Sequence, residues 1–147
     1  MSAKTLESIV NELADREAIR ALPQRYCDCV WRGDVAGIVA LFADDGVFTV
    51  SGGGRDRSAH GRDELLKAYG ADLSSIKPRP YIHNHVIELK PNGRASGRCY
   101  VEVRNATDNM NLLGTGYYND EYVKAGDEWK FQSRSIGLID LQGQATQ

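Results

Sequence analysis

Residues 81–104 read YIHNHVIELKPNGRASGRCYVEVR, and this stretch decides the fold class. Its two ends are rich in β-branched and aromatic residues, which favour strands. Between them lies Pro-Asn-Gly at 91–93, and Asn-Gly between two such runs is a hairpin signal. We therefore predict two antiparallel strands, one from Tyr81 to Leu89 and one from Ala95 to Arg104.

The same pattern continues toward the C-terminus. A loop over 105–111 separates the hairpin from a third β-rich run, Leu112 to Val123. The turn Ala-Gly-Asp at 125–127 then leads to a fourth run, Trp129 to Leu141. Strands that follow one another through such connections form an antiparallel meander.

Toward the N-terminus the periodicity changes to that of helices. Apolar residues recur at helical spacing at Leu6, Ile9, Val10, Leu13 and Ile19. Pro23 is expected to start, kink or end a helical piece, because proline lacks the amide hydrogen that a helix interior uses. A further helix, Val35 to Phe42, has Asp34 as its N-cap.

One short strand and one helix are predicted between these two halves. Val47 to Val50 is β-branched and aromatic, and Ser-Gly-Gly-Gly at 51–54 ends it. Gly61 to Leu73 returns to helical spacing, and prolines at 78 and 80 end that segment. N-terminal helices followed by an antiparallel meander make the fold class α+β, with helices covering one face of the sheet.

Composition and charge exclude several classes of protein. The length of 147 residues suits one domain, and a net charge of −2 with scattered basic residues argues against a nucleic-acid partner. No stretch approaches the roughly 20 apolar residues of a membrane span. Three cysteines, an odd number, and an opening unlike a signal peptide lead us to expect a reducing cytoplasm.

Several motifs together carry a family resemblance. They are the runs Leu13–Arg20, Arg32–Asp34, Leu41–Phe48, Gly61–Leu65, Asn84–Leu89 and Glu128–Phe131, with Tyr26 between the first two. In order and spacing, over about residues 6 to 141, the chain resembles the SnoaL-like branch of the nuclear transport factor 2-like superfamily. The resemblance implies one domain over 1–147, in which N-terminal helices pack on a strongly curved antiparallel sheet to form a cone with one central pocket.

The functions of such relatives fall into two classes. Scytalone dehydratase, bile acid dehydratase, hexachlorocyclohexane dehydrochlorinase and polyketide cyclases are enzymes, whereas dioxygenase β subunits are non-catalytic. The enzymes share acid/base chemistry without metal or organic cofactor, usually through an Asp–His pair. In this chain the two positions of that pair hold Trp31 and Pro80. The resemblance therefore leaves two hypotheses. One is a cofactor-independent lyase, either a dehydratase or an enzyme that eliminates across a C–C or C–O bond, acting on a small hydroxylated aromatic or polyketide-like molecule. The other is a non-catalytic binding or assembly module.

Four residues are the candidates for catalysis. His60 precedes the helix that begins near Gly61, at the expected pocket mouth, and could shuttle a proton; the alternative is an exposed loop histidine. Tyr26 matches the pocket tyrosine of the dehydratases, and Asn84 faces the pocket in the family register; both would hold the leaving group. Arg79, between two prolines, could clamp an anionic oxygen or lie exposed in a loop.

Four further residues are expected to bind the substrate. Trp31, Phe48 and Tyr118 would give the pocket an aromatic lining, which suits a small hydrophobic aromatic substrate, although each could equally belong to the core. Asn105 is a candidate pocket amide, because a buried amide must find hydrogen-bond partners.

His83 and His85 lie two apart in a predicted strand, so their side chains share one face. A metal site formed with His60 is the less favoured reading, and no metal is expected. In the family register both histidines face outward on a stripe with Tyr81, Ile87 and Leu89, which predicts a homodimer or homotrimer. A register error of one residue would reverse these faces.

Overall fold

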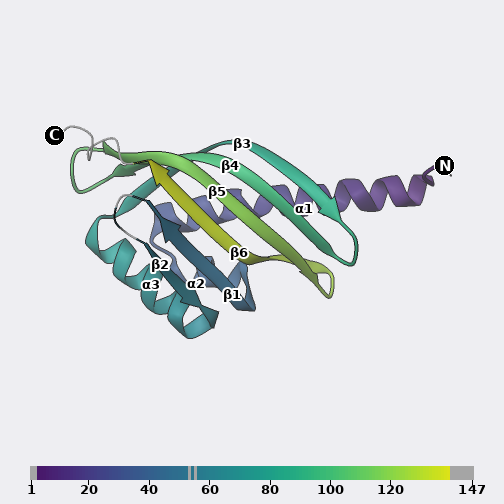
Figure 1. Cartoon of the computed structure of the whole chain (residues 1–147), viewed down its shortest axis with the longest axis horizontal. Coiled ribbons are helices and arrows are strands. Elements are labelled where there is room, and N and C mark those ends of the chain that lie inside the picture. Colours follow the sequence, from purple (N-terminus) through teal and green to yellow (C-terminus); the bar gives the residue numbers. More distant parts are fainter. Residues whose placement is uncertain (1–2, 53, 55, 140–147) are drawn as a thin grey trace.

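The computed structural model describes residues 3–139 except 53 and 55, and its elements confirm the α+β class. The helices are α1 (Leu6–Arg32), α2 (Val35–Ala40) and α3 (Gly61–Ser75). The strands are β1 (Phe42–Ser51), β2 (Arg57–His60), β3 (Pro78–Lys90), β4 (Arg94–Asn105), β5 (Asn111–Ala125) and β6 (Glu128–Ile139). They form one sheet in the order β2-β1-β6-β5-β4-β3, with α1 behind it and α3 beside β1 and β2 (Figure 1).

The sheet is mixed rather than wholly antiparallel. The meander from β3 to β6 is antiparallel as expected, but β1 pairs parallel to β6, with Val47 opposite Ser133. The chain between β1 and β6 holds α3 and four further strands, so no local turn signal marks this pairing. The sheet does not close, because β2 and β3 form its two edges.

Helix α1 runs through Pro23, so the expectation that Pro23 starts or ends a helical segment is wrong. The helix begins with the Thr5 side chain accepting from the Ser8 amide and ends at Gly33, whose φ of 69° is the left-handed conformation that favours glycine. Pro23 is buried, and α1 packs against β3 and β6. Packing against the sheet offsets the one helical hydrogen bond that proline cannot make.

A β-bulge in β3 decides which side chains face inward. His83 pairs with Tyr100 and His85 pairs with Cys99, so Asn84 is the extra residue, with a φ of 44°. Beyond the bulge the partly buried positions are His85, Ile87 and Leu89. His83 and Asn84 are exposed, so the predicted register, with Asn84 inward and His85 outward, is wrong by the one residue that the bulge inserts.

Because of the same bulge, the five residues that were predicted to form an exposed contact stripe do not all face the same side of the sheet. Tyr81 and His83 remain exposed, but His85, Ile87 and Leu89 lie on the side covered by α1. Arg16 and Arg20 of α1 donate to the backbone carbonyls of Ile87 and His85, at 3.2 and 3.4 Å. These bonds cover part of the free edge of the sheet.

No helix within the described ranges combines the length and the apolar character that a membrane crossing requires.

Candidate ligand pocket

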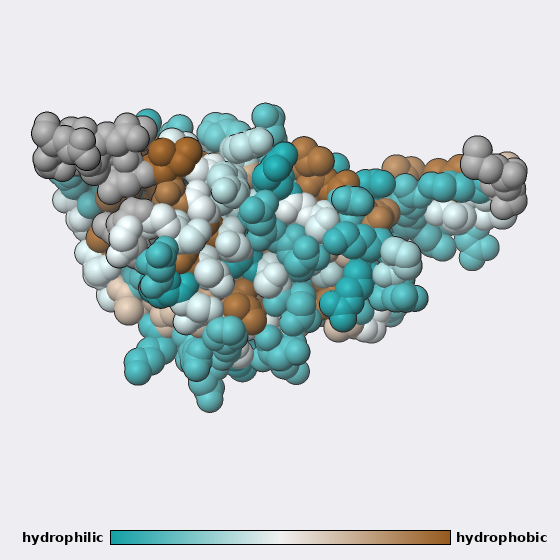
Figure 2. Space-filling view, viewed as in Figure 1, coloured by the Kyte–Doolittle hydropathy of each residue, from teal (hydrophilic) through white to brown (hydrophobic). Residues whose placement is uncertain are grey.

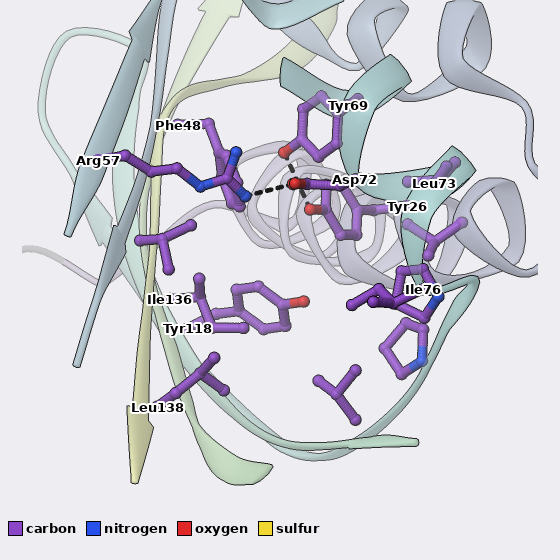
Figure 3. Close-up of a pocket in the computed structure, with 15 residues that line it drawn as sticks. Tyr26, Phe48, Arg57, Tyr69, Asp72, Leu73, Ile76, Tyr118, Ile136 and Leu138 are labelled. Carbon is purple, nitrogen blue, oxygen red and sulfur yellow. Dashed lines mark hydrogen bonds and ion pairs between the residues drawn. The ribbon is translucent and has the colours of Figure 1, made fainter. Parts of the chain in front are cut away.

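The pocket lies between α1, α3 and the inner face of the sheet, and its volume is about 120 Å³ (Figure 3). Most of its wall is apolar: Val30, Val50, Leu73, Ile76, Pro78, Pro80, Val103, Ile136 and Leu138 line it, together with the ring of Phe48. A dry apolar cavity of about 150 Å³ is enough to hold benzene. The volume of the pocket is therefore of the order that a single six-membered ring needs.

Three phenols supply the polar groups inside this wall. Tyr26 comes from α1, Tyr69 from α3 and Tyr118 from β5, and all three are buried. The hydroxyls of Tyr26 and Tyr69 lie 2.9 Å apart, so one donates to the other and one O–H remains for a ligand. Burial raises the pKa of Tyr26 to about 12 and raises the pKa values of Tyr69 and Tyr118 as well. All three are neutral hydrogen-bond donors at pH 7.

An ion pair between Arg57 of β2 and Asp72 of α3 forms the charged side of the pocket. Both side chains are partly exposed, which places them at the solvent end. In Figure 3 the pair stands beside the hydroxyls of Tyr26 and Tyr69. The Asp72 charge lies close enough to Tyr26 to contribute to its raised pKa, after the larger effect of burial. A ligand oxygen near the two phenols would therefore also lie near a carboxylate.

Arg134 of β6 lies beneath the phenol rings and is fully buried. Its guanidinium carbon is 3.5 Å from the centre of the Tyr118 ring and 4.3 Å from that of Tyr26. Asp120, its partner across β5 and β6, pairs with it at 3.5 Å. Burial alone would lower the pKa of Arg134, but Asp120 and the phenols hold it above its usual value, so the side chain is a cation.

Of the residues predicted from the sequence, the structure brings Tyr26, Phe48 and Tyr118 to the pocket. His60 does not line it. That residue is the exposed N-cap of α3, where its Nε2 lies 2.9 Å from Ser58 Oγ and its amide donates to Glu64. The expectation that His60 reaches the pocket fails because β2, which was not predicted, directs its ring outward.

Asn84 and Asn105 also lie elsewhere. Asn84 is exposed at the bulge of β3. Asn105 ends β4, where its Oδ1 accepts from the amide of Thr107 at 2.9 Å and from its hydroxyl at 2.6 Å. Asn84 is therefore the extra residue of a bulge, and the Asn105 side chain stabilises a turn.

Trp31 and Arg79 form a contact outside the pocket. The Arg79 guanidinium lies 5.4 Å from the centre of the Trp31 ring, and Trp31 Nε1 donates to the carbonyl of Pro80 at 2.7 Å. Trp31 and Pro80 are the two positions that the family resemblance assigns to the Asp–His pair. They are in contact, as two paired residues would be, but neither carries an acid or a base.

Four residues of the site were not singled out from the sequence: Arg57, Tyr69, Asp72 and Arg134. Tyr69 lies on the apolar stripe of the predicted helix with Leu65, and its polar tip is the signal that could have found it. Arg57 lies in a strand of four residues without a β-rich pattern, and nothing in the sequence marks it. Within the residues that the structure describes, no group of three His, Cys, Asp or Glu side chains is arranged to hold a metal ion.

Comparison with known proteins places this geometry in context. Residues 11–135 match the model of the SnoaL-like domain. Among solved structures, a protein of unknown function from Mycobacterium tuberculosis is 25% identical, with a TM-score of 0.80 over 92% of this chain and 78% of that one. Among the curated proteins, none matches the chain.

Two structures from Novosphingobium aromaticivorans share the fold at lower identity. A proposed scytalone dehydratase is 21% identical, with a TM-score of 0.74 over 87% of this chain and 86% of that one. The β subunit of a proposed aromatic-ring-hydroxylating dioxygenase is 19% identical, with a TM-score of 0.74 over 90% and 94%. At these identities the likeness shows the fold alone.

Proposed function

The chain belongs to the SnoaL-like domain family, and from that premise we propose that it is a cofactor-independent lyase acting on a small hydroxylated aromatic molecule. The observation that carries the proposal is the Tyr26–Tyr69 hydroxyl pair inside a ring-sized apolar pocket, with Asp72 beside it. These groups supply a donor, a base and a mostly apolar wall, and an elimination uses all three. Such a reaction suits the breakdown of aromatic compounds.

The roles follow from the placement of each group. The ring of the substrate would fill the apolar wall, and its leaving hydroxyl would accept from the Tyr26–Tyr69 pair. Asp72, oriented by Arg57, would remove a proton from the substrate, and that electron pair forms the new double bond. The hydroxyl leaves as water with a proton from the phenol pair, which the proton held by Asp72 then restores.

The test substrate is 1-(4-hydroxyphenyl)ethanol, the secondary benzylic alcohol related to para-ethylphenol. Its dehydration gives para-vinylphenol, and the absorbance of this conjugated product follows the reaction. Tyr69→Phe removes only a hydroxyl, and we expect turnover to fall by about 10²-fold with the fold intact. Tyr100→Phe, on an exposed tyrosine of β4, is the matched control and should leave turnover unchanged.

The carboxylate is tested in the same assay. Asp72→Asn should lower turnover by on the order of 10² or more, whereas Asp63→Asn, on the exposed side of α3, should not. Equal rates for Asp72→Asn and the unsubstituted protein would remove Asp72 from the mechanism.

The second candidate is a non-catalytic binding or assembly module, favoured by Trp31 and Pro80 at the positions of the Asp–His pair. The fold is shared with the β subunit of a proposed aromatic-ring-hydroxylating dioxygenase. Under this hypothesis para-ethylphenol binds the pocket, no benzylic alcohol turns over, and Asp72→Asn leaves the affinity unchanged. A cytoplasmic location stays a prediction under either function.

A further inference from the structure

Arg134 is a buried cation whose contacts are mostly aromatic faces. Besides Tyr118 and Tyr26, the Phe131 ring lies 4.7 Å from its guanidinium carbon. Among the described residues, its Nε and Nη1 have no hydrogen-bond partner, and neither has Oδ1 of Asp120. One ion pair at 3.5 Å therefore offsets only part of the cost of burying this charge.

The position of the cation matters because the two rings it contacts carry pocket hydroxyls. Tyr26 and Tyr118 both line the cavity, and Arg134 contacts both rings without being one of the residues that line it. In an interior of low effective dielectric, a cation this close to the rings favours negative charge on them and on an oxygen bonded to their hydroxyls. Asp120 opposes this effect, since it holds the opposite charge next to the guanidinium.

We infer that Arg134 is a positioning residue that acts through Tyr26 and Tyr118 to make the pocket select ring compounds whose bound oxygen carries negative charge, such as acidic phenols and enolates. The inference rests on the proposed function only in sharing its pocket, and it deepens that function by naming the ligand class. Asp72, which is paired with Arg57 at the mouth, also lies near the rings, and its charge acts on Tyr26 in the opposite sense to Arg134.

The experiment uses phenol, para-chlorophenol and para-nitrophenol as probes of rising acidity, with affinities measured at one pH. The unsubstituted protein should bind the probes more tightly as their acidity rises. Arg134→Met should weaken para-nitrophenol binding by about tenfold and flatten this dependence. Asp120→Asn should do the opposite, because it removes the charge that opposes Arg134, and Arg134→Lys should recover part of the loss.

The two substitutions discriminate between electrostatics and structure because both break the same ion pair. A merely structural role predicts that Arg134→Met and Asp120→Asn weaken all three probes alike, and that result would overturn the inference. Circular dichroism checks that each variant is folded. If Arg134→Met does not fold, Asp120→Asn decides alone: a steeper dependence on probe acidity supports the inference, and an unchanged or flatter one overturns it.

The outcomes also separate this inference from the proposed function. Binding that follows probe acidity without turnover of any benzylic alcohol contradicts the lyase and leaves the role of Arg134 standing. Turnover with a flat acidity dependence in all variants contradicts the role of Arg134 alone. If none of the phenols binds the unsubstituted protein, both proposals fail.

Discussion

At the scale of single residues, His85 is a titratable group whose pKa is lowered by its position on the inner face of the sheet. Its Nε2 lies 2.9 Å from the Tyr122 hydroxyl, which donates to Asp120 at 2.9 Å. Nε2 therefore donates its proton to Tyr122, and the ring is neutral. Burial, with the positive charges of Arg20 and Arg134, lowers the pKa of His85 to about 4.

This pKa shift makes the free energy of unfolding depend on pH between about 4 and 6.5. Between the ordinary value near 6.5 and the folded value of about 4, the unfolded chain binds the proton first, so stability falls as the pH is lowered from 6.5 toward 4. Above that window His85 adds no pH dependence. Because its ring is only partly buried, we expect an effect on the order of 1 kcal/mol.

Urea unfolding of His85→Gln at pH 7 and pH 5 measures this contribution. The variant should lose less stability between the two pH values than the unsubstituted protein does. His60→Gln, on an exposed ring, is the control and should keep the original difference. An unchanged difference in His85→Gln would show that the ring titrates normally in the folded protein.

Which site residues the sequence could reveal depends on their chemistry. The family resemblance places Tyr26 in the pocket, and the sequence predicts Phe48 and Tyr118 as pocket or core residues. Arg134 was missed because arginine is exposed by default. A signal for it exists: in the hairpin around residues 125–127, Asp120 and Arg134 are cross-strand partners, and opposite charges at paired positions predict contact.

At the scale of elements, the bulge in β3 makes a prediction about Asn84. Its φ of 44° lies in the left-handed region, where asparagine is tolerated, glycine is comfortable and β-branched residues are strained. Asn84→Gly should therefore keep both stability and turnover. Asn84→Val should lower the free energy of unfolding by about 1–2 kcal/mol.

Chemical denaturation of both variants checks this, with Val86→Ala on the same strand as a control for side-chain loss at an exposed site. If Asn84→Gly instead lost turnover without losing stability, Asn84 would have the ligand-binding role that the sequence suggested.

The elements also show where local patterns stop being informative. All four strands of the meander were predicted to within a few residues, because alternation and turn chemistry are local. Strand β2 was missed, since Arg-Ser-Ala-His has no β-rich pattern and gains its pairing from β1. Pro23 was misread because helix propensity is local, whereas the packing that holds α1 together is tertiary.

At the scale of the whole molecule, the family resemblance predicted the α+β fold and one pocket, but it could not place the chemistry. The family resemblance assigns the two positions of the Asp–His pair to Trp31 and Pro80. These two residues are in contact in the structure. The polar groups that the pocket does contain come from α1, from the consecutive elements β2 and α3, and from β5, so they span residues 26 to 118. No spacing rule links them, so only the assembled fold brings them together.

A homo-oligomer remains a prediction, but the contact surface that we now expect is on α1 instead of β3. The first turns of α1 project beyond the sheet, and brown residues lie along this projecting part (Figures 1 and 2). Four apolar side chains there are exposed: Leu6, Ile9, Val10 and Leu13. A helical stretch this short is marginal in water without packing.

The spacing of this stripe indicates a second copy of the chain as its partner. Positions 6, 9, 10 and 13 are symmetric about their midpoint, so an antiparallel pair related by a two-fold axis brings Leu6 of one copy opposite Leu13 of the other. We expect light scattering to show a dimer at micromolar concentration. Val10→Glu would place like charges at the centre of the contact and should give a monomer, while Glu17→Gln, on an exposed residue beyond the stripe, should not. A monomeric unsubstituted protein, or a dimer that Val10→Glu leaves intact, would contradict self-association through this helix.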